Sequence, residues 1–154
     1  MASTVKAKTL RVTVQEDIVL NGVNYGSKRK VNIASVNEIL KRVVTLPASN
    51  TTTLLTFNDN VYGAAGAIDT GDAKYIRITN LDDANSIELA FIDASGLYQI
   101  RLSAGESYML GSPEVLQLTE ADTSPSFGTM LDLVTISANP GGNAVDVEIF
   151  VASA

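Results

Sequence analysis

The sequence predicts an all-β protein, an antiparallel β-sandwich of the jelly-roll type with an extended basic N-terminal segment. Three observations lead to this prediction. Apolar and polar residues alternate with a period of two, turn-forming residues interrupt these runs at short intervals, and the first third of the chain carries most of the bases. A length of 154 residues fits one ordinary domain.

The first alternating run is KTLRVTV at residues 8–14, with Leu10, Val12 and Val14 on one side. We expect residues 1–15 to form an N-terminal arm or a first strand, and residues 16–154 to form a single β-sandwich domain.

The second run, EILKRVVTLP at residues 38–47, allows two interpretations. Ser35 and Glu38 have the spacing of a capping box, which would begin a helix. The β-branched residues and Pro47 favour a strand instead, and we predict a strand.

Alternation is clearest from Lys74 onward, where each strand is expected to have one buried and one solvated face, as in antiparallel sheets. The apolar sides of these four runs are Ile76 and Ile78; Ile87, Leu89 and Phe91; Tyr98, Ile100 and Leu102; and Val145, Val147, Ile149 and Val151. Turn sequences punctuate the chain at residues 21–22 (NG), 47–50 (PASN), 94–96 (ASG), 103–106 (SAGE) and 139–143 (NPGGN). Residues 58–73 are rich in small residues and predict a long surface loop.

The composition excludes several catalytic mechanisms and metal sites for this chain. It has no cysteine and no histidine, so a disulfide framework, a thiolate metal site and the Ser-His-Asp, Cys-His and zinc hydrolase mechanisms are excluded for the chain acting alone. Phosphate-binding glycine motifs are absent. We therefore expect a protein that is not an enzyme and that needs no cofactor.

One short motif favours an enzyme. Asp69-Thr70-Gly71 matches the triplet of aspartic proteases, in which two aspartates share a proton across a dimer. YMLGS at residues 108–112 offers the apolar element that braces such a loop. The position of the triplet in mid-chain and the carboxylate of Asp72 directly after it oppose this interpretation, so a dimeric aspartic protease is kept as a remote alternative.

The stretch ITNLDDANSIEL at residues 78–89 raises the question of a metal site. Asp82, Asp83 and Asn85 offer oxygen ligands of the kind that calcium prefers. The EF-hand spacing fails, and Asp and Asn are also the residues that a hairpin loop needs. We predict a polar hairpin turn between Ile78 and Ile87. Asp59, Asp69 and Asp72 are a second candidate oxygen site.

Charge is distributed unevenly. Residues 1–42 carry eight bases and three acids, a net charge of +5, whereas residues 43–154 carry three bases and 14 acids, a net charge of −11. The two parts either face different neighbours or neutralise each other inside one fold. The acidic total does not favour nucleic-acid binding, and no apolar run is long enough for a membrane span or a signal peptide.

Several segments together resemble small β-sandwich accessory proteins of tailed-phage virions. The resemblance is carried by VNYGSKRKVNIASVNEILKRVVTLPAS, LLTF, AKYIRITNLDDANSIEL, GLYQIRLSAGESYML and LDLVTISANPGGNAVDVEIFVAS, and it covers roughly residues 20–152. In those proteins an IRITN strand and an L-x-x-G-E-S turn recur.

The resemblance implies a structural virion protein made in the host cytoplasm. The expected role is a capsid decoration or cement subunit on the capsid surface, which binds between major capsid proteins and self-associates as a homotrimer. The alternative is a tail or fibre-tip module that binds host-surface glycans. For a capsid decoration subunit, the residues expected to face the capsid are Lys6, Lys8, Arg11, Lys28, Arg29 and Lys30.

Overall fold

A computed structural model describes residues 4–60, 66–115 and 127–154 of the chain. These residues form strands and turns and contain no helix, which confirms the all-β prediction. No helix that is long and apolar enough to cross a bilayer therefore occurs in this part of the chain.

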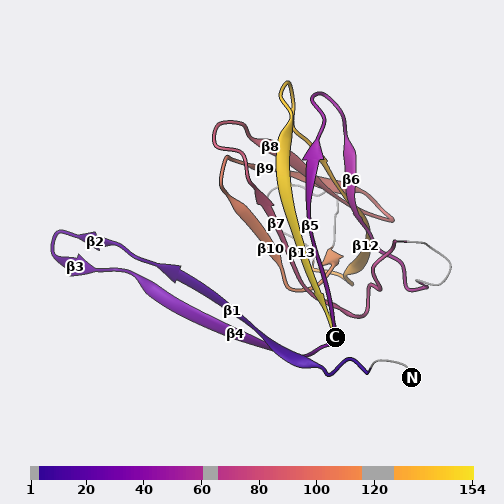
Figure 1. Ribbon diagram of the computed structural model, residues 1–154, viewed down its shortest axis with the longest axis horizontal. Coiled ribbons are helices and arrows are strands. Elements are labelled where there is room, and N and C mark those ends of the chain that lie inside the picture. Colours follow the sequence, from indigo (N-terminus) through magenta and orange to yellow (C-terminus); the bar gives the residue numbers. More distant parts are fainter. Residues whose placement is uncertain (1–3, 61–65, 116–126) are drawn as a thin grey trace.

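Two antiparallel sheets pack face to face in a sandwich (Figure 1). One sheet has the order β5-β13-β7-β10 and the other the order β6-β12-β8-β9, with β11 also pairing β12. Successive strands from β5 to β8 alternate between the sheets, and this strand order is that of a jelly roll. The strands are β5 (Glu38–Leu46), β6 (Thr52–Thr56), β7 (Ala73–Asn80), β8 (Ile87–Asp93), β9 (Leu97–Leu102), β10 (Ser107–Leu110), β11 (Glu114–Val115), β12 (Leu131–Asn139) and β13 (Val145–Ser153).

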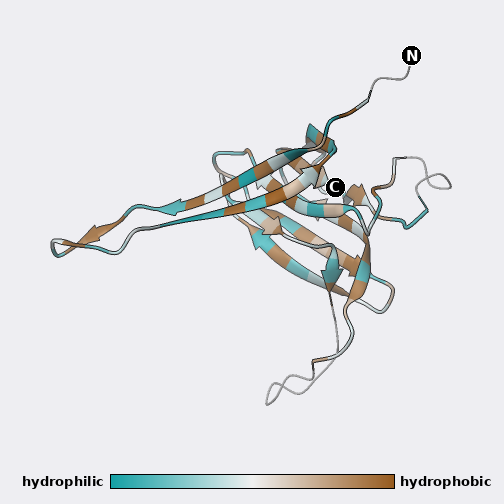
Figure 2. Ribbon diagram, turned by 90° about the horizontal axis from the view of Figure 1, so that it is seen from below, coloured by the Kyte–Doolittle hydropathy of each residue, from teal (hydrophilic) through white to brown (hydrophobic). Residues whose placement is uncertain are grey.

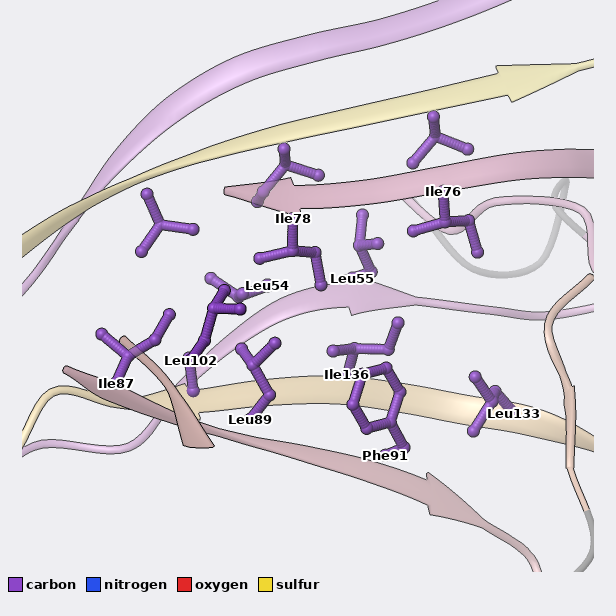
Figure 3. Packing of buried hydrophobic residues seen from close by; sticks show 14 of the residues in the cluster. Leu54, Leu55, Ile76, Ile78, Ile87, Leu89, Phe91, Leu102, Leu133 and Ile136 are labelled. Atoms are coloured by element: carbon purple, nitrogen blue, oxygen red, sulfur yellow. The ribbon is translucent and has the colours of Figure 1, made fainter. Parts of the chain in front are cut away.

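The core lies between the two sheets (Figure 3). It contains the inner-face residues that alternation predicts for β7, β8 and β13, and it also contains residues of β6 and β12 that were not predicted, Leu54, Leu55, Leu133 and Ile136 among them. Ile76 and Ile78 of β7 face Leu89 and Phe91 of β8 across the sandwich, and all four side chains are at most 1% exposed. Burying each such side chain contributes about 1.5–3 kcal/mol relative to leaving it exposed. Hydrophobic burial therefore holds the two sheets together.

The strand predicted at residues 38–47 is confirmed as β5, and the helical alternative is wrong. Ser35, the expected N-cap, lies in the preceding strand and has a φ of 62°, in the left-handed region, whereas an N-cap residue takes β-region backbone angles. β5 pairs along its whole length with β13, from Val145 opposite Leu46 to Ser153 opposite Glu38. This pairing satisfies backbone groups that a helix would have used internally.

A long hairpin, which we call the arm, projects from the base of the sandwich (Figure 1). Its stem is β1 (Lys8–Glu16) paired with β4 (Ser27–Val36), and its tip is β2 (Val19–Leu20) paired with β3 (Val23–Asn24). The arm thus runs to Val36, and the predicted boundary at residue 15 is wrong. The cause is the pairing of β1, which in the described chain goes to β4 and to neither sheet of the sandwich.

The segment after Ile78 also differs from its prediction. It was expected to be a hairpin turn, but β7 and β8 belong to opposite sheets and do not pair. Residues 81–86 therefore form a connection from one sheet to the other. A hairpin turn within one sheet and a connection between two sheets have the same sequence pattern, a polar loop between two alternating runs. The surface loop predicted at residues 58–73 is irregular apart from a bridge between Phe57 and Ile68, and its residues 61–65 lie outside the described chain.

Candidate functional site

The stem of the arm has two chemically different faces. Directly opposite residues of an antiparallel pair lie on the same face of the ribbon. Val12 pairs with Val31 and Leu10 with Ile33, so one face of the stem is apolar. The other face carries the pairs Arg11–Asn32, Thr13–Lys30 and Gln15–Lys28, and is polar and basic.

All six basic residues singled out from the sequence are exposed, and the structure brings three of them together. Arg11, Lys28 and Lys30 share the polar face, whereas Arg29 lies opposite Val14 on the apolar face. Lys8 lies at the base of the stem opposite Val36, and Lys6 precedes it. Within the described chain these bases form no ion pairs; the ion pairs found there lie in the sandwich, at Lys41–Glu148, Arg77–Glu148 and Arg101–Glu88.

The tip of the arm carries an apolar cluster that sequence reasoning did not single out. A turn at Asn21-Gly22, both with positive φ, joins the two short strands as the Asn-Gly signal predicts. The tip cluster consists of Ile18, Val19, Leu20, Val23 and Tyr25, all at least 52% exposed. Hydrophobic colouring marks this far end of the arm in Figure 2. The Asn-Gly signal predicts the turn here but cannot tell which of the neighbouring side chains are left uncovered.

A groove of about 420 Å³ separates the base of the arm from the sandwich. On the arm side it is lined by consecutive residues of β1, namely Leu10, Arg11, Val12, Thr13 and Val14. Leu10, Val12 and Val14 of these belong to the apolar face. On the sandwich side it is lined by outward residues of the sheet β5-β13-β7-β10, namely Tyr75, Arg77, Ser107, Met109 and Phe150. The Tyr75 and Phe150 rings make an edge-on contact with centroids 6.0 Å apart.

The loop after β7 is organised by hydrogen bonds within the protein. The Oδ1 atom of Asp82 accepts hydrogen bonds from the backbone N–H groups of Ala84, at 2.8 Å, and of Asn85, at 2.6 Å, and from the Asn85 side-chain amide at 3.1 Å. The backbone hydrogen bonds from Asn85 and Ala84 are the main cause that lowers the pKa of Asp82. Asp82, Asp83 and Asp146 line a shallow hollow at this end of the sandwich.

The described residues contain no group of three or more acidic side chains placed to hold a metal ion. This applies to both candidate calcium sites, the one at Asp82 and Asp83 and the one at Asp59, Asp69 and Asp72. The Asp-Thr-Gly triplet lies in the turn that enters β7, where the Asp69 carboxylate accepts a hydrogen bond from the Gly71 N–H at 2.9 Å. A protease dyad would take its other aspartate from a second copy.

Comparisons with known proteins give little further information. No protein-family model and no curated protein matches the chain. A solved structure from work on Bacillus endospore appendages, described as a family of disulfide-linked pili, is similar with a TM-score of 0.41 and 10% sequence identity. The match covers 75% of this chain and 85% of that chain. A likeness at this level carries no argument about function.

Proposed function

We propose that this protein is a non-enzymatic structural subunit of a virion, a decoration or cement protein that binds between major capsid proteins on the capsid surface. The observation that carries the proposal is the arm, which stands away from its own domain and presents Arg11, Lys28 and Lys30 on one exposed face. A base cluster of this kind, unpaired within the described chain, suits an acidic surface on a partner.

The shape of the arm supports an architectural role. A two-stranded hairpin is marginally stable by itself in water, so a stem of this length gains order when another surface covers it. A polar and an apolar face allow two different surfaces to be contacted at once. We further propose that the subunit self-associates as a homotrimer, because a closed symmetric assembly presents several arms together. Repeated weak contacts then bind the particle with high avidity.

The test is occupancy on virions that carry the protein. We expect rising ionic strength to release the subunit from particles. The variant with both Lys28→Gln and Lys30→Gln should dissociate at a lower salt concentration than the wild type. The matched control is Lys74→Gln with Arg101→Gln, which removes the same charge from the sandwich. Occupancy that is insensitive to both the arm substitutions and salt would contradict the electrostatic contact.

Removal of the whole arm, residues 1–36, should abolish binding while the sandwich still folds. Cryo-electron microscopy of the particle then decides the location. Density on the capsid between major capsid subunits is the expected result. Density on the tail would overturn the proposal and favour the glycan-binding alternative.

A further inference from the structure

The tip cluster and the groove are complementary in hydrophobicity. The tip presents Leu20 and Val23 side by side on paired strands, 57% and 52% exposed. The groove presents Met109, Phe150 and the apolar face of the stem. Exposed apolar clusters of this kind mark interaction sites.

Their charges are complementary as well. The tip segment, residues 16–26, contains two acids, Glu16 and Asp17, and no base. Two bases border the groove. Arg77 on the sandwich side already pairs with Glu148, whereas Arg11 on the stem belongs to the polar face and forms no ion pair in the described chain. On a larger scale, residues 1–36 carry six bases and two acids, a net +4, whereas residues 37–154 carry five bases and 15 acids, a net −10. The arm of one copy is therefore attracted to the sandwich of another.

The arm cannot make this contact within one molecule. The groove lies at the base of the arm, where β1 passes the outer face of the sheet β5-β13-β7-β10, and the tip lies at the opposite end of an extended hairpin (Figures 1 and 2). Only a second copy can bring a tip into the groove.

We propose that the tip cluster of one copy docks into the arm-base groove of the next copy. Tip and groove are different surfaces, so the contact is heterologous, and its repetition around a rotation axis closes a ring. The inference rests on the self-association part of the proposed function and names the surface that carries it.

Cysteine cross-linking tests the contact, because the chain has no native cysteine. Leu20→Cys labels the tip, and Met109→Cys labels the groove. We would co-express and co-purify the two single variants and treat them with a short bismaleimide. Docking brings the two thiols to an effective concentration of roughly millimolar, about a hundredfold above a ~10 μM protein solution. We therefore expect cross-linked dimers from the mixture and none from either variant alone.

One further variant should disrupt the contact, and a second variant is its control. Leu20→Ser with Val23→Ser should return the protein to a monomer in light scattering, without change in the melting temperature of the sandwich, because both side chains are exposed at the tip. Leu97→Ser removes an apolar side chain of similar exposure, 53%, from the sandwich and should leave the assembly unchanged.

Three outcomes would overturn the inference. Cross-linking of Leu20→Cys with itself would show a tip-to-tip contact. A wild-type oligomer that gives no cross-link between tip and groove would overturn the docking surface and leave self-association standing. A wild-type monomer at all accessible concentrations would overturn both.

Discussion

Arg77 on β7 donates a hydrogen bond of 2.5 Å to Glu148 on the neighbouring strand β13, and Lys41 on β5 approaches the same carboxylate at 3.5 Å. Three adjacent strands of one sheet are thus connected on its outer face. The Arg77 guanidinium also lies 5.9 Å from the centre of the Phe150 ring, next to the arm-base groove. The hydrogen bond from Arg77 is the main cause that lowers the pKa of Glu148.

This relationship predicts a pH-dependent contribution to stability. Because the folded-state pKa of Glu148 lies below its ordinary value of 4.5, the contribution is present above that value and is lost as the pH falls through the folded-state pKa. We expect Glu148→Gln to lower the free energy of unfolding at pH 7 by about 1 kcal/mol, and by less at pH 3. Urea unfolding at both pH values measures this. Glu88→Gln, in the exposed pair with Arg101, should cost under about 0.5 kcal/mol; equal losses in the two variants would contradict the prediction.

The fully buried side chain of Asn80 predicts a larger effect. Its amide nitrogen lies within hydrogen-bonding distance of three backbone carbonyls, those of Asn85 at 2.8 Å and of Leu102 and Ser103 at 3.2 Å, so it ties the loop after β7 to the end of β9. Asn80→Ala leaves these acceptors buried without that donor and should cost about 3 kcal/mol. Chemical denaturation measures it.

The control for Asn80 is Asn143→Ala, which removes an exposed amide that donates to Asn85 at 3.0 Å. We expect a loss of under about 0.5 kcal/mol there, as for other surface substitutions. A similar loss at both positions would show that burial of the Asn80 amide does not matter.

Phe91 anchors the aromatic part of the core. Its ring stacks on Tyr98 with centroids 4.7 Å apart and contacts Tyr108 at 5.0 Å. Phe91→Ala should lower the free energy of unfolding by about 4 kcal/mol, because it removes apolar contacts and leaves a cavity. Phe91→Leu, which fills most of that volume, should cost about 1.5 kcal/mol. Comparable losses for the two variants would contradict a cavity as the cause.

Asp82 should act as a hydrogen-bonded loop residue and not as a calcium ligand. Its Oδ1 atom already accepts from Ala84 and Asn85, so we expect neither added calcium nor EDTA to change the melting temperature. Asp82→Ala should lower the melting temperature, because the loop loses these bonds. The matched control is its neighbour: Asp83→Ala should leave the melting temperature unchanged. Stabilisation by calcium that is lost in either variant would restore the metal site.

The strands and much of the core followed from sequence because their signals are local. A period of two decides which residues of a strand point inward, whatever the strand pairs with, and this predicted the inner faces of β7, β8, β9 and β13. The turn signals at Asn21-Gly22 and at residues 103–106 are equally local, since they depend on backbone conformations that few residues adopt.

The pairing between strands that are distant in the chain could not be predicted from local sequence signals. The segment from Asn80 to Ile87 has the composition of a hairpin, yet it crosses between sheets, because β7 pairs with β13 and β10 while β8 pairs with β12 and β9. The aspartate pair was placed in a turn from sequence, but the hydrogen bonds that involve Asn80 depend on β9 and on its distant carbonyls.

By itself, the sequence determined an all-β chain without cysteine or histidine and with a basic first third. Only the tertiary structure decided that this first third leaves the sandwich as a hairpin to Val36, with three of its bases on one face, an apolar stripe on the other and an uncovered apolar tip. The physical reason is that alternation specifies two faces for every strand, whereas the layer that covers each face is set by contacts between residues far apart in the chain.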